Sequence, residues 1–287
     1  MRWEEGHESP DVIDRRGRGG GGMGGIVALL PFLLRSRGGV IVLLALLAFV
    51  ALSSLGKWSG LFGASDEVQT SSVRSDDKKA QFVAFVLDDV QDTWKKEFAA
   101  RGATYRNAKL VMFTDATPTA CGQGQAATGP FYCPADERVY IDLSFYDELE
   151  RRFGAKGDFA QAYVIGHEIG HHVQNLLGVS EAVHAAKRSE QKGATGLDVR
   201  LELQADCFAG VWAHATEQRG LLEAGDIDEA LGAASAIGDD RMQRMAGRAV
   251  NPESWTHGSA AQRSRWFKKG FESGDPASCD TFGAAVL

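Results

Sequence analysis

Two histidines and a glutamate stand near the middle of the chain at the spacing of a metal site, in the segment GHEIGHH. His167 and His171 are four residues apart, so a helix places both imidazoles on one face, one turn apart, where they can share an ion. Imidazole nitrogen binds zinc at about 2.0–2.1 Å, and a catalytic zinc combines three protein ligands with an open position for water. Glu168 would lie beside the metal, where it can take a proton from a water whose pKa the metal lowers. The pattern predicts a hydrolytic Zn²⁺ site that needs a third ligand.

The setting of this motif favours a functional site over a surface helix with incidental histidines. In a chain with seven histidines, the motif arises by chance about once in a hundred such chains. Apolar residues recur at helical spacing over residues 158–177, and Gly178 is typical of a helix C-terminus. Gly166 and Gly170 each cost about 1 kcal/mol relative to Ala inside a helix. Such glycines indicate that another backbone or a substrate comes close to this helix.

A second predicted helix, residues 198–219, offers the third ligand. Glu202 and Asp206 are four residues apart and share a face. A carboxylate at Glu202 completes a His, His, Glu set, and Asp206 can accept the free N–H of a ligand histidine, His167 or His171. The alternative is that Glu202 is a solvated helix charge. Apolar neighbours favour a buried helix: Cys207, Phe208, Val211 and Trp212.

The remaining histidines are assigned by their context. His257, in THGSAAQR, precedes a predicted helix and can act as a hydrogen-bond donor to an oxyanion. The alternative for His257 is a loop that caps the helix. His172 points about 100° away from His171, so we predict a structural role. His184 and His214 have no motif around them.

The elements predicted around the motif are mostly helices. Helical spacing and capping residues predict further helices at 77–101, at 145–153, from an N-cap at Asp226, and from an N-cap at Ser259 through Lys269. Two β-prone runs, 110–113 and 139–143, are separated by a glycine-rich loop. This order predicts an α+β fold, mostly helical, with a small β-sheet.

The glycine-rich loop CGQGQAATGPFYC is bracketed by Cys121 and Cys133, which we expect to form a disulfide. Cys207 would pair with Cys279, or Cys207 is a buried free thiol. No Cys-x-x-Cys pair is present, so a zinc ribbon is not favoured.

The run 139–143 is a candidate edge strand that a substrate peptide could join by β-augmentation. Phe131 and Tyr132 would then contact the substrate at the rim of the cleft, or they fill the core around the disulfide.

Before the predicted domain, residues 77–287, the composition changes three times. Residues 1–37 are polar and then glycine-rich, which predicts a disordered tail. Residues 38–56 approach the roughly 17–20 apolar residues of a transmembrane helix, and residues 57–76 read as a linker. A cleaved signal peptide is the alternative, but its basic region would have to be about 40 residues long, far beyond the usual pattern.

Basic residues flank the predicted span unevenly. Only Lys57 follows it closely, whereas six arginines precede it: Arg2, Arg15, Arg16, Arg18, Arg35 and Arg37. The positive-inside rule then places the N-terminus in the cytoplasm and the domain outside. All four cysteines lie on that outer side, where disulfides persist. The net charge of −7 and pI near 5.5 argue against a nucleic-acid partner.

The combination of HEIGHH and ELQAD resembles the glutamate-type zincins, in which a second helix carries Glu-x-x-x-Asp. Over nearly the whole chain, the sequence is similar to the Putative neutral zinc metallopeptidase family of bacterial membrane proteins. The stretches that carry this resemblance are the MRW start with its glycine-rich tail, TACGQGQAATGPFYCPADERVYIDLSF, HEIGHHVQNLLG, RLELQADCFAGVWAH and THGSAAQRSRWFKKGF. The resemblance implies a bacterial origin, a zincin-like fold and peptide-bond hydrolysis.

These observations together predict a metalloendopeptidase anchored in the bacterial inner membrane by one helix, with a periplasmic or extracellular domain that acts on peptides or proteins. The main alternative is a catalytically inactive zinc-binding scaffold or chaperone with a zincin fold. Glu168 argues against it, because a structural zinc site has no use for that carboxylate. A further alternative is a zinc amidase that acts on cell-wall peptides. The oligomeric state is left open by the sequence.

Overall fold

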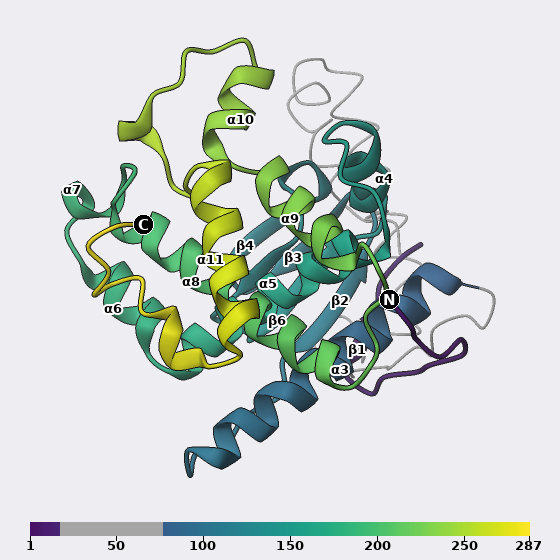
Figure 1. Cartoon of the computed structure of the whole chain (residues 1–287). Helices are drawn as coiled ribbons and strands as arrows, with labels where there is room; N and C mark the ends of the chain where they lie inside the picture. Colours follow the sequence, from purple (N-terminus) through teal and green to yellow (C-terminus); the bar gives the residue numbers. More distant parts are fainter. Residues whose placement is uncertain (18–76) are drawn as a thin grey trace, which may run out of the picture. The chain divides into compact units, whose positions relative to one another are not determined.

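The computed structural model describes residues 1–17 and 77–287 (Figure 1). Its three longest helices are α3 (Lys78–Ala100), α5 (Asp158–Leu176) and α8 (Leu197–Gln218). Helix α11 (Ala260–Ser273) packs along α8, and α9 (Asp226–Ala236) packs on both α5 and α11. The shorter helices are α4 (Ser144–Arg151), α6 (Val179–Ala185), α7 (Arg188–Gln191) and α10 (Asp239–Met245).

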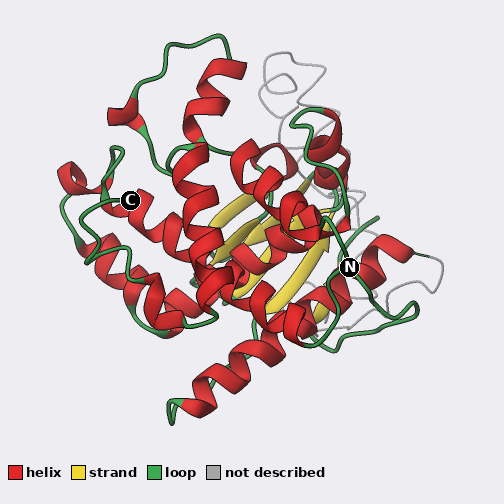
Figure 2. Ribbon diagram, in the orientation of Figure 1, coloured by secondary structure: helices red, strands yellow, loops and turns green. Residues whose placement is uncertain are grey.

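A four-stranded mixed sheet lies against these helices (Figure 2). Its strands, in spatial order, are β1 (Val12–Asp14), β2 (Lys109–Phe113), β6 (Arg138–Asp142) and β5 (Phe131–Cys133). The β1–β2 and β2–β6 pairs are parallel, and the β6–β5 pair is antiparallel. A separate antiparallel hairpin is formed by β3 (Ala116–Thr119) and β4 (Gly122–Gln125). These elements confirm the predicted α+β class with a small sheet.

Both faces of the central strand β2 are covered, which explains its uninterrupted apolar sequence. Successive side chains of a strand point to opposite faces. Leu110 and Met112 therefore join the main core with the helices, whereas Val111 and Phe113 join a second cluster with Ile13 on the other face.

The first residues of the chain belong to the folded domain. Met1–Arg15 forms one compact unit with the described residues from 77 to 287, and β1 pairs with β2 over three residues. The amide of Arg2 also donates to the carbonyl of Leu221 at 2.7 Å. The predicted disordered tail is therefore wrong for Met1–Arg15. Strand β1 is short and flanked by charged residues, so it lacked the apolar run by which a strand is predicted.

This pairing also bears on orientation. Because β1 is hydrogen-bonded to β2, Met1–Arg15 must lie on the same side of any membrane as the domain. The predicted arrangement, with the N-terminus across a membrane from the domain, does not fit this contact. The predicted span, residues 38–56, and linker, residues 57–76, lie outside the described residues. None of the helices within residues 1–17 and 77–287 is long and apolar enough to cross a membrane.

Strand β6, predicted from 139–143, is not an edge strand. It lies between β2 and β5, and within the described residues β1 and β5 form the two edges of the sheet. The prediction of a substrate-binding edge at 139–143 is therefore wrong. The short strand β5 lies inside a segment rich in glycine and proline, which gave no strand pattern of its own.

The capping residues show how local sequence sets the helix ends. The Ser259 side chain accepts from the amide of Gln262 in a capping box, as predicted for an N-cap. Asp226 is the first residue of α9 rather than its N-cap, because Gly225 takes that position. The Asp226 carboxylate instead accepts from the amide of Glu223 at 2.8 Å.

Asp11, beside β1, should make the stability of the domain sensitive to acid. Burial raises the pKa of Asp11, but hydrogen bonds from Lys109, Asn107 and Gln91 outweigh it and hold the pKa below its ordinary value. A carboxyl group whose pKa is lower in the folded than in the unfolded protein stabilises the folded state. This contribution is complete at pH values above the unfolded-state pKa of about 4, and it is lost as the pH falls through the folded-state pKa. Asp11→Asn should therefore reduce the loss of unfolding free energy between pH 6 and pH 3, measured by urea denaturation.

The matched control is Asp92→Asn, since Asp92 is 63% exposed in its ion pair with Lys95. That change should leave the pH dependence of unfolding as in the parent. An Asp11→Asn protein that loses as much stability in acid as the parent would contradict the assignment.

Candidate metal centre and catalytic cleft

The two glycines of the motif helix allow α8 to lie very close to α5. A Cβ at Gly170 would be 2.9 Å from the carbonyl oxygen of Ala205, and one at Gly166 would be 2.9 Å from the Trp212 ring. Real Cβ atoms do not tolerate such contacts, so both positions need glycine. The close approach predicted from these glycines is confirmed, and it brings the carboxylates of α8 to the histidines of α5.

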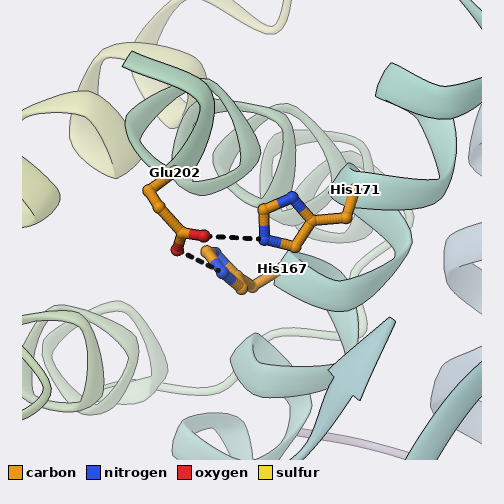
Figure 3. A group of neighbouring side chains, drawn as sticks. All are labelled: His167, His171 and Glu202. Carbon is orange, nitrogen blue, oxygen red and sulfur yellow. Dashed lines mark ion pairs between the residues drawn. The ribbon is translucent and has the colours of Figure 1, made fainter. Parts of the chain in front are cut away.

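His167, His171 and Glu202 converge with their ligand atoms within 4.8 Å of one another (Figure 3). One carboxylate oxygen of Glu202 lies 3.3 Å from Nε2 of His167, and the other lies 3.4 Å from Nε2 of His171. Two ligands bound to zinc at about 2.0–2.1 Å in tetrahedral geometry are separated by about 3.3–3.4 Å. The donor types and spacings thus fit a zinc ion held by these three residues.

Behind His167 lies a buried carboxylate. Oδ1 of Asp206 is 2.8 Å from Nδ1 of His167, and Asp206 is fully buried. Burial raises the pKa of Asp206, but Arg263 and His167 outweigh it and bring the pKa to about 2. Asp206 is therefore a carboxylate that accepts the Nδ1–H, which leaves Nε2 of His167 directed toward Glu202. Of the two histidines considered as its partner, Asp206 bonds to His167.

Two residues that the sequence analysis did not identify complete this network. Arg263 donates to Asp206 from Nε at 2.8 Å and from Nη2 at 2.9 Å, and the Tyr163 hydroxyl also donates to Asp206. Arg263 is 1% exposed. One signal could have identified it, because Arg263 occupies the apolar stripe of α11 with Trp266, Phe267 and Gly270.

His171 has a different partner. Its Nδ1 lies 2.9 Å from Oε1 of Gln174, one turn further along α5. Gln174 is fully buried. The two histidines are therefore backed by groups of different charge, a carboxylate for His167 and a neutral amide for His171.

A cavity of about 770 Å³ opens beside the three ligands. Glu168 lines it and is 7% exposed. Burial raises the pKa of Glu168, against the opposing effect of His167 and His171. A carboxyl group whose pKa is moved toward neutrality is suited to exchange protons with water.

The cavity wall includes the edge strand of the sheet. Residues from Gly129 to Tyr132 line it. The Phe131 ring stacks on Tyr140 with centroids 5.1 Å apart, and the Tyr132 hydroxyl lies 2.9 Å from Nδ1 of His172. Both aromatic residues therefore pack into the fold and also face the cleft, so neither predicted alternative excludes the other.

His257 also lies on the cavity wall, with its side chain 53% exposed. Its Nδ1 is 3.3 Å from Oδ1 of Asp239. The other oxygen of Asp239 accepts from the amides of Thr256, His257 and Gly258 at 2.7–3.1 Å. Hydrogen bonding to Asp239, against the smaller effect of desolvation, raises the pKa of His257.

The other histidines are held differently. His172 is fully buried, with Nε2 2.6 Å from the carbonyl oxygen of Arg106, and it does not join the metal ligands. Nδ1 of His214 lies 2.7 Å from the carbonyl oxygen of Phe271. His184, for which no role was predicted, lines the cavity.

Both expected disulfides are present. Cys121 pairs with Cys133, which joins the β3–β4 hairpin to the edge strand β5. Cys207 pairs with Cys279, which joins α8 to the C-terminal segment. Cys207 is thus not a free thiol.

The chain matches one protein family and several bacterial proteins. A family model described as Putative neutral zinc metallopeptidase matches residues 1–282. The chain is 48% identical over 290 residues to the uncharacterized protein YpfJ of Escherichia coli K12, covering 100% of both chains. It is 48% identical over 194 residues to uncharacterized proteins of Mycobacterium bovis and Mycobacterium tuberculosis, covering 64% of this chain and 65% of each relative. No solved structure matches the chain.

Proposed function

This chain belongs to the Putative neutral zinc metallopeptidase family, and from that premise we propose that it hydrolyses peptide bonds with a zinc ion held by His167, His171 and Glu202. The observation that carries the proposal is the buried Glu168 beside this donor set, in a cavity large enough for a peptide segment. A structural zinc site fills its fourth position with protein and needs no such carboxylate.

We assign each step of peptide hydrolysis to a residue of the cleft. A zinc ion held by these residues would supply a Lewis acid and lower the pKa of water toward about 7. Glu168 accepts the proton of the attacking water and then donates it to the leaving amine. His257, oriented by Asp239, donates a hydrogen bond to the oxygen on which negative charge develops.

The edge strand β5 supports a way to bind an extended substrate. Strand β6 pairs with one edge of β5, and among the described residues no strand pairs with its other edge. Residues from Gly129 to Tyr132 line the cavity. We propose that a peptide adds to this free edge by β-augmentation, so that its backbone crosses the metal centre. Such binding depends on the backbone of the substrate more than on its side chains. It therefore favours a protein or peptide substrate over a small amide.

We also propose attachment to the bacterial inner membrane through residues 38–56, with the domain in the periplasm, where its two disulfides would persist. In place of a single span, the β1–β2 pairing supports an arrangement in which both flanks of the attaching segment lie on the domain's side. A membrane-impermeant thiol reagent should therefore label cysteines introduced at Arg2 and at Glu217 from the same side of intact vesicles. Labelling from opposite sides would exclude this arrangement.

Removing the metal tests the proposed function directly. A chelator should abolish peptide cleavage, and one equivalent of zinc should restore it.

Glu202→Gln should lower zinc affinity by more than the roughly 10–100-fold typical of a residue behind a ligand, because it removes the charge of a direct ligand. Zinc content can be measured by elemental analysis and affinity by competition with a chromogenic chelator.

Glu217→Gln, an exposed change on the same helix, should leave both zinc affinity and cleavage unchanged. If Glu202→Gln bound zinc as tightly as the parent, the ligand set would be wrong. A parent protein that holds zinc tightly but cleaves no peptide from a broad library would instead favour the scaffold alternative.

A further inference from the structure

A chain of side-chain amides extends from His171 to the C-terminal segment. Nδ1 of His171 lies 2.9 Å from Oε1 of Gln174. Nε2 of Gln174 donates to the carbonyl oxygen of Leu201 at 2.7 Å and to Oε1 of Gln204 at 3.1 Å. Nε2 of Gln204 in turn donates to the carbonyl oxygen of Cys279 at 3.1 Å.

The direction of these hydrogen bonds is set by two backbone carbonyls, those of Leu201 and Cys279. A carbonyl oxygen can only accept, so Gln204 must turn its NH₂ group toward Cys279 and its oxygen toward Gln174. Gln174 must then turn its NH₂ group toward Leu201 and Gln204, which leaves its oxygen facing His171. A reversed amide would place two acceptors or two donors against each other in a buried site, which is costly.

The direction of these hydrogen bonds sets which ring nitrogen of His171 carries a proton. An amide oxygen at Nδ1 requires that this nitrogen carry a proton, so the lone pair of His171 is on Nε2. That nitrogen is the one 3.4 Å from Glu202. The ring is thus held ready to bind metal without a carboxylate behind it.

We propose that Gln174 and Gln204, the glutamine pair, are positioning residues that hold His171 in its metal-binding tautomer and orientation. The inference rests on the zinc site of the proposed function. Both glutamines are buried, at 0% and 8% exposure, as expected for a network whose members are all satisfied.

The Cys207–Cys279 disulfide anchors the far end of this network. It ties the segment that carries the last acceptor to α8, the helix that also supplies Glu202. Arg200 holds the same segment through the carbonyl oxygens of Phe282 and Ala284, at 3.2 and 3.1 Å. The C-terminal segment therefore helps to orient a metal ligand on a different helix.

Zinc affinity and the state of the His171 ring test this proposal. Gln174→Met, which keeps the length of the side chain but no hydrogen bond, should raise the zinc dissociation constant about 10–100-fold. Gln204→Met should raise it less, because Gln174 keeps its contact with Leu201. In ¹⁵N spectra of histidine-labelled, zinc-bound parent protein, Nδ1 of His171 should carry a slowly exchanging proton. In Gln174→Met that proton should exchange faster, while the Nδ1 proton of His167 stays protected by Asp206.

The matched control is Gln91→Met, which removes a buried glutamine that donates to Asp11 and does not line the cavity. It should lower the melting temperature without changing zinc affinity. A zinc dissociation constant within two-fold of the parent in folded Gln174→Met would overturn the proposal, as would a His171 ring without a proton on Nδ1 in the parent.

These readouts do not depend on turnover. If Gln174→Met does not fold, the His171 signals of the parent and the zinc affinity of Gln204→Met still test the role of the glutamine pair. If the zinc-bound parent cleaves no peptide, the proposed function fails while the glutamine pair is still judged by affinity. If the parent binds no zinc, the zinc site fails, and the protonation of His171 in the metal-free protein decides the role of the pair.

Discussion

Glu168→Gln should reduce peptide cleavage by the zinc-bound protein about 100- to 10,000-fold, the range expected when a general acid–base group is removed. The amide has nearly the shape of the carboxyl group but cannot accept the proton of the attacking water. Glu168 is not one of the three converging ligands. Zinc content and melting temperature should therefore stay close to those of the parent. The measurement is the rate of cleavage of a quenched fluorescent peptide at saturating zinc.

The same variant separates the enzyme from its alternatives. Glu217→Gln serves as the control, since it removes an exposed glutamate of α8 with the same change in charge. Unchanged cleavage in Glu168→Gln, at full zinc occupancy, would rule out Glu168 as the base. Cleavage of cell-wall peptides, but not of unstructured proteins, by the parent would favour the amidase.

Arg263→Met should destabilise the metal-free protein by about 3–5 kcal/mol, the cost of leaving one member of a buried ion pair alone. Arg263 donates two hydrogen bonds to Asp206, and the side chains of both are at most 2% exposed. Without Arg263, Asp206 keeps only the hydrogen bonds from Tyr163 and His167 in a site that water barely reaches. Urea denaturation of the metal-free protein at pH 7 measures the effect without a contribution from zinc.

A second substitution tests whether the unpaired charge is the cause. Asp206→Asn in the Arg263→Met background removes the unpaired carboxylate, so it should recover part of the lost stability. Arg244→Met is the control, since Arg244 is 58% exposed in its pair with Asp240, and it should cost less than about 1 kcal/mol. If Arg263→Met cost no more than this control, the buried pair would not be an important support of the site.

Much of the helical body and the three candidate metal ligands could be predicted from the sequence, because both depend on local spacing. The run over 158–177 corresponds to α5, and its four-residue histidine spacing is a property of any helix. Glu202 and Asp206 were found by the same rule on α8, and the glycines of α5 indicated that another backbone comes close. Ser259 is an N-cap because its hydroxyl bonds to an amide three residues away. Each of these signals lies within one turn or one helix.

Other features were decided only by contacts between distant segments. Strand β1 is held by the backbone of β2, about a hundred residues later, and backbone pairing leaves little trace in a run as short as VID. Which strand forms the sheet edge depended on β5, whose three residues carry no pattern of their own. In the site, Gln174 and Arg263 look like ordinary surface residues by type. Their roles arise because α5, α8, α11 and the C-terminal segment enclose them, and a buried polar group must then find its partners across the fold.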